Sequence, residues 1–176
     1  MRTLRPLVTG AAVLAMLAGL GTAAVAQEED SPLVTHVTGT VIDTFYDDST
    51  AEATFAPEDV HFVNGATYVE TNEWDDPRLP ADKKMVLNFI TYPDAGGRFM
   101  VTRTSIRLDG PDGSWVGTGV GVVDPDGSSH GQDVLVGEGA YEGLTAVLNC
   151  GTESGCEGYI FEGEMPPEPD PVPPAE

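Results

Sequence analysis

The chain has 176 residues and carries 29 acidic but only 8 basic side chains, a formal net charge of −21 at pH 7. So acidic a surface repels phosphate backbones and anionic lipid headgroups, which excludes nucleic acids and membrane surfaces as partners. A hydrophobic content of 40% is too high for a wholly disordered chain, and 2 cysteines with 21 glycines exclude a disulfide-rich miniprotein and a collagen.

Residues 1–26 have the three parts of a secretory leader. Arg2 and Arg5 give a positive start, an apolar stretch follows, and the small-x-small motif Ala-Val-Ala ends at Ala26. Cleavage between Ala26 and Gln27 would leave six basic residues, 29 acids and a net charge of −23. The alternative is a retained membrane anchor, but the apolar run is short for a span and three acids follow it at once. We therefore expect a secreted protein, exported by the general secretory route and not attached to a membrane after cleavage.

Short β-branched and aromatic segments, separated by Gly, Pro and Asp turns, follow the leader, and they predict strands. An acidic, mobile segment at 27–33 precedes them. The expected strands lie at 34–43, in the second part of 45–55, and at 60–63, 66–71, 85–92, 98–108, 114–123, 133–136, 141–150 and 157–164. Asn64-Gly65 predicts a hairpin turn, because both residues tolerate positive φ. Residues 74–84, with two prolines and a charge cluster, predict a loop, and the Pro- and Glu-rich residues 165–176 predict a disordered tail.

No ten-residue window outside the leader has helical periodicity, so the fold class is all-β and antiparallel, with about eight strands in residues 34–164. Two architectures remain, a barrel and a β-sandwich. In the strand that begins near Trp115, the alternate residues Gly117, Gly119 and Gly121 form a glycine stripe on one face. Such a stripe permits strong coiling and close packing, which favours the barrel and turns the glycine face toward its interior.

Cys150 and Cys156 are the only cysteines, and the five residues between them are polar and turn-like. In an oxidising compartment they are expected to form a disulfide across a loop between two strands. The alternative is a redox pair or half of a metal site. That alternative lacks a C-x-x-C spacing and a nearby histidine.

Motifs for catalysis and for cofactors are missing from the sequence. The glycine-rich segments are followed by strands rather than helices, so they do not predict a phosphate-binding loop. The three histidines are scattered, there is no Gly-x-Ser-x-Gly elbow, and the many acids single out no catalytic pair. We therefore predict no cofactor and no transition-metal site, while weak calcium binding by the acidic turns stays open.

The candidate ligand-binding residues are Arg103, Arg107 and Trp115. Arg103 and Arg107 share one face of a strand in a chain with few basic residues, so they could clamp an anion at a barrel mouth. The alternative is ordinary cross-strand pairing with the abundant acids. Trp115 stands at one end of the glycine stripe, where it would pack across the glycines or cap the opening of the lumen.

The second half of the chain resembles a known barrel family. The segments 113–119 (GSWVGTG), 137–145 (GEGAYEGLT) and 158–163 (GYIFEG) are similar to the glycine turns and the final strand of allene oxide cyclase-like and dirigent-like proteins. The segment 74–79 (WDDPRL) resembles a loop in a secreted bacterial branch. This resemblance implies an eight-stranded barrel with an apolar lumen, often in a homo-oligomer. Family members cyclise a reactive lipid or steer radical coupling, but none of their lumen acids can be aligned here.

These observations predict a secreted β-barrel that binds a small apolar or amphipathic molecule or serves as an extracellular accessory protein. One alternative is an isomerase or cyclase that uses polar groups of the lumen, and another is a structural acidic surface protein. A lumen with an ionisable residue of shifted pKa would favour the enzyme. A deep apolar lumen would favour the binder, and a lumen filled by side chains would favour the structural role.

Overall fold

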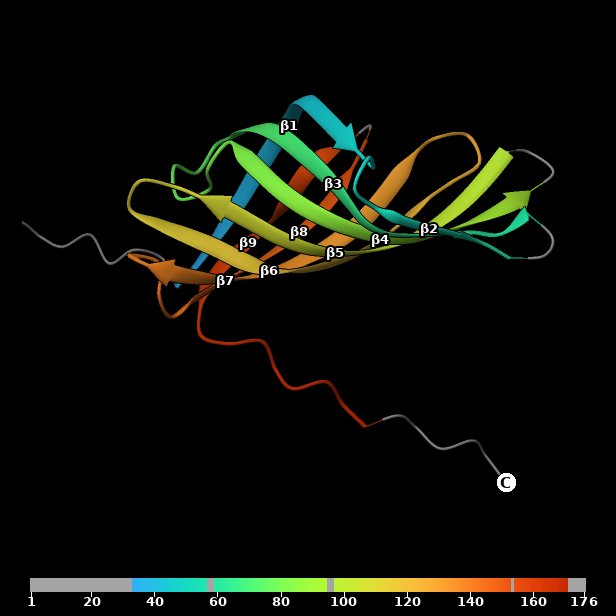
Figure 1. Ribbon diagram of the computed structural model, residues 1–176. Coiled ribbons are helices and arrows are strands. Elements are labelled where there is room, and N and C mark those ends of the chain that lie inside the picture. The colour runs from blue at the N-terminus through green and yellow to red at the C-terminus, as the bar shows by residue number, and fades with distance from the viewer. Residues whose placement is uncertain (1–32, 57–58, 95–96, 153, 171–176) are drawn as a thin grey trace, which may run out of the picture. The chain divides into compact units, whose positions relative to one another are not determined.

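The computed structural model describes residues 33–56, 59–94, 97–152 and 154–170, and these contain nine strands and no helix (Figure 1). The strands are β1 (Val34–Asp47), β2 (Glu52–Phe55), β3 (His61–Trp74), β4 (Asp82–Asp94), β5 (Gly97–Asp109), β6 (Gly113–Val123), β7 (Ser129–Gly139), β8 (Leu144–Gly151) and β9 (Gly155–Glu162). The predicted leader and its cleavage point at Ala26–Gln27 lie outside the described residues, as does most of segment 27–33. Of the predicted tail, residues 165–170 are described, and they contain no strand.

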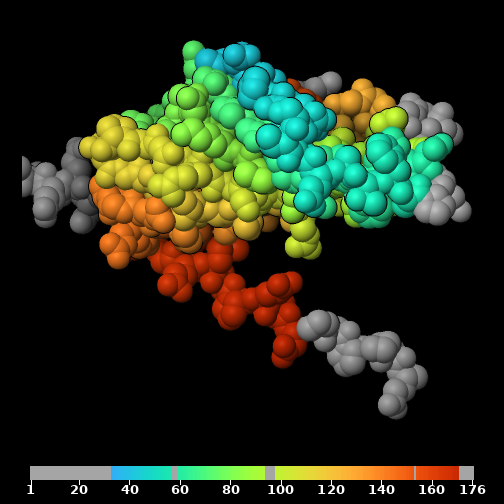
Figure 2. All heavy atoms as spheres, viewed as in Figure 1, coloured from blue at the N-terminus to red at the C-terminus, as the bar shows by residue number. Residues whose placement is uncertain are grey.

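All nine strands belong to one antiparallel sheet with the order β1-β9-β8-β7-β6-β5-β4-β3-β2. β1 also pairs with β3, and this pairing closes eight strands into a ring to which β2 is added at the edge of β3. In the space-filling view, β1 and β2 in blue to cyan lie against the green side chains of β3 and β4 (Figure 2). The prediction of an all-β antiparallel fold with about eight strands is confirmed, although the ring is not a regular barrel.

The irregularity lies where β1 closes the ring. Residues 34–39 of β1 pair with β9, whereas residues 39–47 pair with β3, and a bulge between Val41 and Asp43 shifts the register. β3 is divided in the same way, because its residues 61–64 pair with β2 and its residues 67–74 pair with β1. Among the described residues, the second half of β1 therefore has a strand on one side only.

The predicted hairpin at Asn64-Gly65 is wrong. Both predicted strands belong to one continuous strand, β3, and the dipeptide forms a bulge where the register against β4 shifts between Asn64 and Ala66. Gly65 has a φ of +84°, and its N–H donates to Oδ1 of Asn88 at 2.9 Å. The dipeptide thus uses the same positive φ that a tight turn needs, but at one residue only, and it bends the strand instead of reversing it.

The glycine stripe of β6 faces the interior, as its sequence predicts. Trp115 is fully buried and Gly119 is buried, whereas Val120 on the other face is 54% exposed. A Cβ added to Gly117 would collide with the carbonyl oxygen of Val134 on β7, so only glycine permits this close approach of the two strands.

An apolar core fills one end of the ring. Its buried members are Val37, Leu79, Met85, Ile106, Leu108, Trp115, Leu135, Tyr141, Ala146, Leu148 and Ile160. Trp115 stacks on Tyr141 with ring centroids 5.4 Å apart, and its Nε1 donates to the backbone oxygen of Arg78 at 2.7 Å. Arg78 and the buried Leu79 belong to the loop between β3 and β4, so this loop closes the core end of the ring.

The same loop is shorter than the sequence predicts, because β3 runs through Trp74 and β4 begins at Asp82. Its conformation is fixed by two acids. Asp75 accepts hydrogen bonds from the N–H and the hydroxyl of Thr38 at 2.8 and 2.7 Å, and Asp76 forms a 2.6 Å salt bridge with Arg78. The early start of β4 places Lys83 inside a strand rather than in a loop.

Candidate functional site

Beside the apolar core, the ring contains a cavity of about 440 Å³. Its lining is mainly apolar and aromatic, with Tyr68, Met85, Leu87, Phe89 and Met100 among the contributing side chains. Thr102, Thr104 and Gly121 line it from β5 and β6, and Ser129, His130 and Thr152 line it near the turns. Three charged residues, Glu70, Lys83 and Asp133, also line the cavity, and we call them the ionic cluster. The cavity is thus apolar with one ionic region.

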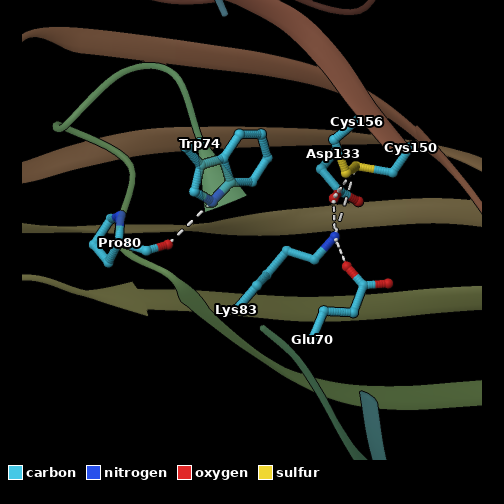
Figure 3. The surroundings of a disulfide bond; sticks show 7 residues. All are labelled: Glu70, Trp74, Pro80, Lys83, Asp133, Cys150 and Cys156. Carbon is cyan, nitrogen blue, oxygen red and sulfur yellow. Dashed lines mark hydrogen bonds and ion pairs between the residues drawn. A yellow bond between two sulfur atoms is a disulfide. The ribbon is translucent and has the colours of Figure 1, made fainter. Parts of the chain in front are cut away.

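The ionic cluster joins three strands across the lumen (Figure 3). Lys83 on β4 is cross-strand partner of Glu70 on β3, and its Nζ lies 2.6 Å from Oε2 of that residue. The same Nζ lies 3.1 Å from Oδ2 of Asp133 on β7, to which it also donates a hydrogen bond. The side chain of Lys83 is only 2% exposed, so its ammonium is not solvated by bulk water. Its charge is compensated by the two protein carboxylates.

Burial and charge shift the pKa values of this cluster. Burial raises the pKa of Asp133, because it disfavours the carboxylate, and the ammonium of Lys83 opposes this shift only in part. Burial alone would lower the pKa of Lys83, but the charges of Asp133 and Glu70 outweigh it and raise that pKa. Lys83 is therefore a firmly held cation, and Asp133 is a carboxyl group that takes up a proton more readily than an exposed aspartate.

The predicted disulfide is confirmed. Cys150 on β8 and Cys156 on β9 are cross-strand partners with Cα atoms 4.0 Å apart, and they are bonded to each other. Sγ of Cys150 lies 3.7 Å from Nζ of Lys83, so the disulfide borders the ionic cluster. No free thiol remains among the described residues. The bond is compatible with an extracellular location, because disulfides persist in oxidising compartments.

Two polar groups next to the ionic cluster have no hydrogen-bond partner within the described residues. Oγ1 of Thr104 is buried and belongs to a residue that lines the cavity. The amide of Asn72, in a residue that is 2% exposed, lacks partners for both its oxygen and its nitrogen. The absence of a side chain at Gly119 makes room for the carboxylate of Asp133 inside the ring. A Cβ at this position would collide with Oδ1 of Asp133 and Oγ1 of Thr104. Glycine therefore leaves the space that these polar groups occupy.

The three predicted ligand-binding residues do not line this cavity. Arg103 and Arg107 lie on the exposed outer face of β5, because the alternate residues Ile106 and Leu108 are buried. Arg107 pairs with Asp109 and with Glu138, as the cross-strand alternative expects. Trp115 is part of the apolar core and does not cap an opening. A role of these three side chains in ligand binding stays a prediction, and it would concern a site other than the cavity.

Sequence reasoning missed the ionic cluster. The signal for Lys83 is the alternation Lys83, Met85, Leu87 and Phe89, in which a lysine shares a face with three apolar side chains that line the cavity. Glu70 and Asp133 have no comparable signal, because they are two acids among 29.

No group of three or more His, Cys, Asp and Glu residues that could hold a metal ion occurs in the described part of the chain. In the same part of the chain, there is no helix long and apolar enough to cross a membrane. Comparison with known proteins gives no match to a protein-family model, to a curated protein or to a solved structure. The resemblance to allene oxide cyclase-like proteins therefore stays a prediction that rests on the glycine and aromatic motifs.

Proposed function

We propose that the protein is exported and binds a small amphipathic molecule in the cavity of its eight-stranded ring. The observation that carries this proposal is the cavity itself, about 440 Å³ in volume, with apolar walls and a localised ionic cluster. Small-molecule sites typically measure 300–1,000 Å³, and they combine apolar walls with a few placed polar groups. The alternative of a purely structural protein requires a lumen filled by side chains, and the cavity argues against it.

Ligand extraction tests the proposal. The protein is purified from the culture medium of its own host under non-denaturing conditions, and its mass is measured intact and then after denaturation. We expect a bound small molecule whose volume fits the cavity and which carries an apolar part and a polar group. Empty protein that also fails to take up amphipathic molecules from a culture extract would contradict the proposal.

Export is supported by the leader-like residues 1–26 and by the disulfide between Cys150 and Cys156. N-terminal sequencing of the protein from the medium is expected to start at Gln27. A mature chain that starts at Met1 and stays in the cell would contradict export, while ligand binding could still be tested on the same material.

A second candidate function is an isomerase or cyclase, and one observation favours it. The carboxyl group of Asp133 lines the cavity, and burial raises its pKa, so it holds a proton more readily than an exposed aspartate, as a proton donor requires. The test is to return the extracted molecule to the protein in large excess. A binder returns it unchanged, whereas an enzyme converts it and loses this conversion in Asp133→Asn.

A further inference from the structure

The chemistry of the ionic cluster indicates what kind of polar group a ligand presents to it. The cluster holds two carboxylates, Glu70 and Asp133, and one ammonium, Lys83. With both acids ionised it carries one excess negative charge, inside a lumen where that charge is poorly solvated. A ligand that brings a positive charge would balance it, and a ligand carboxylate would increase the imbalance.

The hydrogen-bonding groups around the cluster point in the same direction. Lys83 is the one lysine or arginine that lines the cavity among the described residues, and its Nζ already contacts both carboxylates. Within the described residues, no hydrogen bond reaches Oδ1 of Asp133, and the side chain of Asp133 is 11% exposed. An ammonium group offers three donors and no acceptor, so it can donate to the carboxylate of Asp133, whereas a ligand carboxylate offers acceptors only.

The walls of the cavity add a third contribution. Tyr46, Tyr68 and Phe89 line it, and aromatic faces attract cations through their quadrupoles. The net charge of −21 on the whole chain also raises the local concentration of cations over that of anions.

We infer that the lumen ligand is an amphipathic amine, whose protonated nitrogen binds at the carboxylates of the ionic cluster, chiefly that of Asp133, while its apolar part contacts the cavity walls. This inference rests on the proposed function, since it names the ligand class of the same cavity.

The test compares three probes of equal chain length by isothermal titration calorimetry at pH 7: octylammonium, 1-octanol and octanoate. Octylammonium is expected to bind most tightly and octanoate least tightly. Asp133→Asn is expected to weaken octylammonium binding by about tenfold or more, because it removes one unit charge near the ligand cation, and to leave 1-octanol nearly unaffected.

Two further variants keep the test decisive. Glu70→Gln leaves Lys83 paired with Asp133, so it is expected to fold even if Asp133→Asn does not, and it is expected to weaken octylammonium binding by about fivefold or more because it removes one unit charge from the cluster. Glu162→Gln makes the same change of net charge on the exposed surface of β9 and is expected to leave all three affinities unchanged.

The outcomes separate the inference from the proposed function. If 1-octanol or octanoate binds as tightly as octylammonium, or if neither cavity variant weakens octylammonium binding, the inference is overturned and the proposed function stands. If none of the three probes binds, the cavity does not take amphipathic molecules of this size, and both fail.

Discussion

Replacing Lys83 by methionine tests whether the ionic cluster contributes to the stability of the ring. Lys83 is the cation between two carboxylates at 2.6 and 3.1 Å, and methionine has a similar length but no charge. Removing one partner of a buried ion pair typically costs 3–5 kcal/mol, because the remaining charge is buried without compensation. For Lys83→Met we expect a loss of about 3 kcal/mol in the free energy of unfolding, the lower end of this range. The side chains of Glu70 and Asp133 are 16% and 11% exposed, so each carboxylate can still be partly hydrated or take up a proton.

The assay is chemical denaturation at pH 8 and pH 5, with the free energy of unfolding extrapolated to water. Without the ammonium, the pKa of Asp133, already raised by burial, rises further. The unfolded-state pKa of an aspartate is about 3.9, and a group whose folded-state pKa is higher stabilises the fold while it is protonated. This stabilisation is lost as the pH rises through the folded-state pKa. The stability loss of Lys83→Met is therefore expected to be larger at pH 8 than at pH 5.

The matched control is the neighbouring Lys84→Met, whose side chain is 58% exposed and pairs with Asp109 at 3.2 Å. An exposed ion pair of this kind contributes about 0–1 kcal/mol. A triple variant that also converts Glu70 and Asp133 to leucine is expected to recover most of the loss, because no uncompensated charge remains. The reasoning is refuted if Lys83→Met is within about 0.5 kcal/mol of Lys84→Met at both pH values.

The remaining predictions concern the core, the disulfide and the loop that closes the core end. Trp115→Ala is expected to lose about 3–5 kcal/mol in chemical denaturation, since the side chain is fully buried, and Gly119→Val is expected to be comparably destabilising because no space exists for its methyl groups. Near-neutral values for both would place the glycine face in solvent. Thiol titration of the unreduced protein is expected to find no free thiol, and replacing Cys150 and Cys156 by alanine is expected to lose about 2 kcal/mol by loop entropy; two reactive thiols would contradict this. The pKa of Asp76 is lowered by its hydrogen bonds to the neighbouring guanidinium, so it stabilises the fold above the unfolded-state pKa, and this contribution is lost as the pH falls through the folded-state value. Asp76→Asn is therefore expected to lose about 1 kcal/mol at pH 7 and almost nothing near pH 2, and an equal loss at both pH values would argue against the salt bridge.

Local patterns in the sequence were sufficient for the fold class. The period-2 alternation of β6 places Trp115 and Gly119 on one face, and the polar loop between Cys150 and Cys156 predicts their pairing. At Asn64-Gly65 the local pattern was ambiguous, because a tight turn and a bulge require the same positive φ at glycine. Only the pairing of β3 with β4 on both sides of the dipeptide decides between them, and that pairing is a long-range property.

The site could not be predicted for a related reason. The rarity of basic residues singles out Arg107 in the sequence, but the burial of Ile106 and Leu108 on the other face of β5 turns it outward. Two nearby prolines predict a loop around Lys83, although its alternation with Met85 indicates an inward position in a strand. The partners of Lys83 come from strands far away in the sequence, and among so many acids only the closed ring selects them.

Blocking the cavity tests the central claim, that the ring binds a small molecule in its lumen. Thr102 lines the cavity opposite Gly121, so Thr102→Phe would place an aromatic ring inside it, while Ser105→Phe adds the same ring on the exposed face of the same strand. The measurement is native mass spectrometry of the parent and both variants after incubation with octylammonium. We predict a bound molecule in the parent and in Ser105→Phe but none in Thr102→Phe, provided that circular dichroism shows all three folded. Equal occupancy of the parent and of folded Thr102→Phe would contradict the account, because the molecule would then bind outside the lumen.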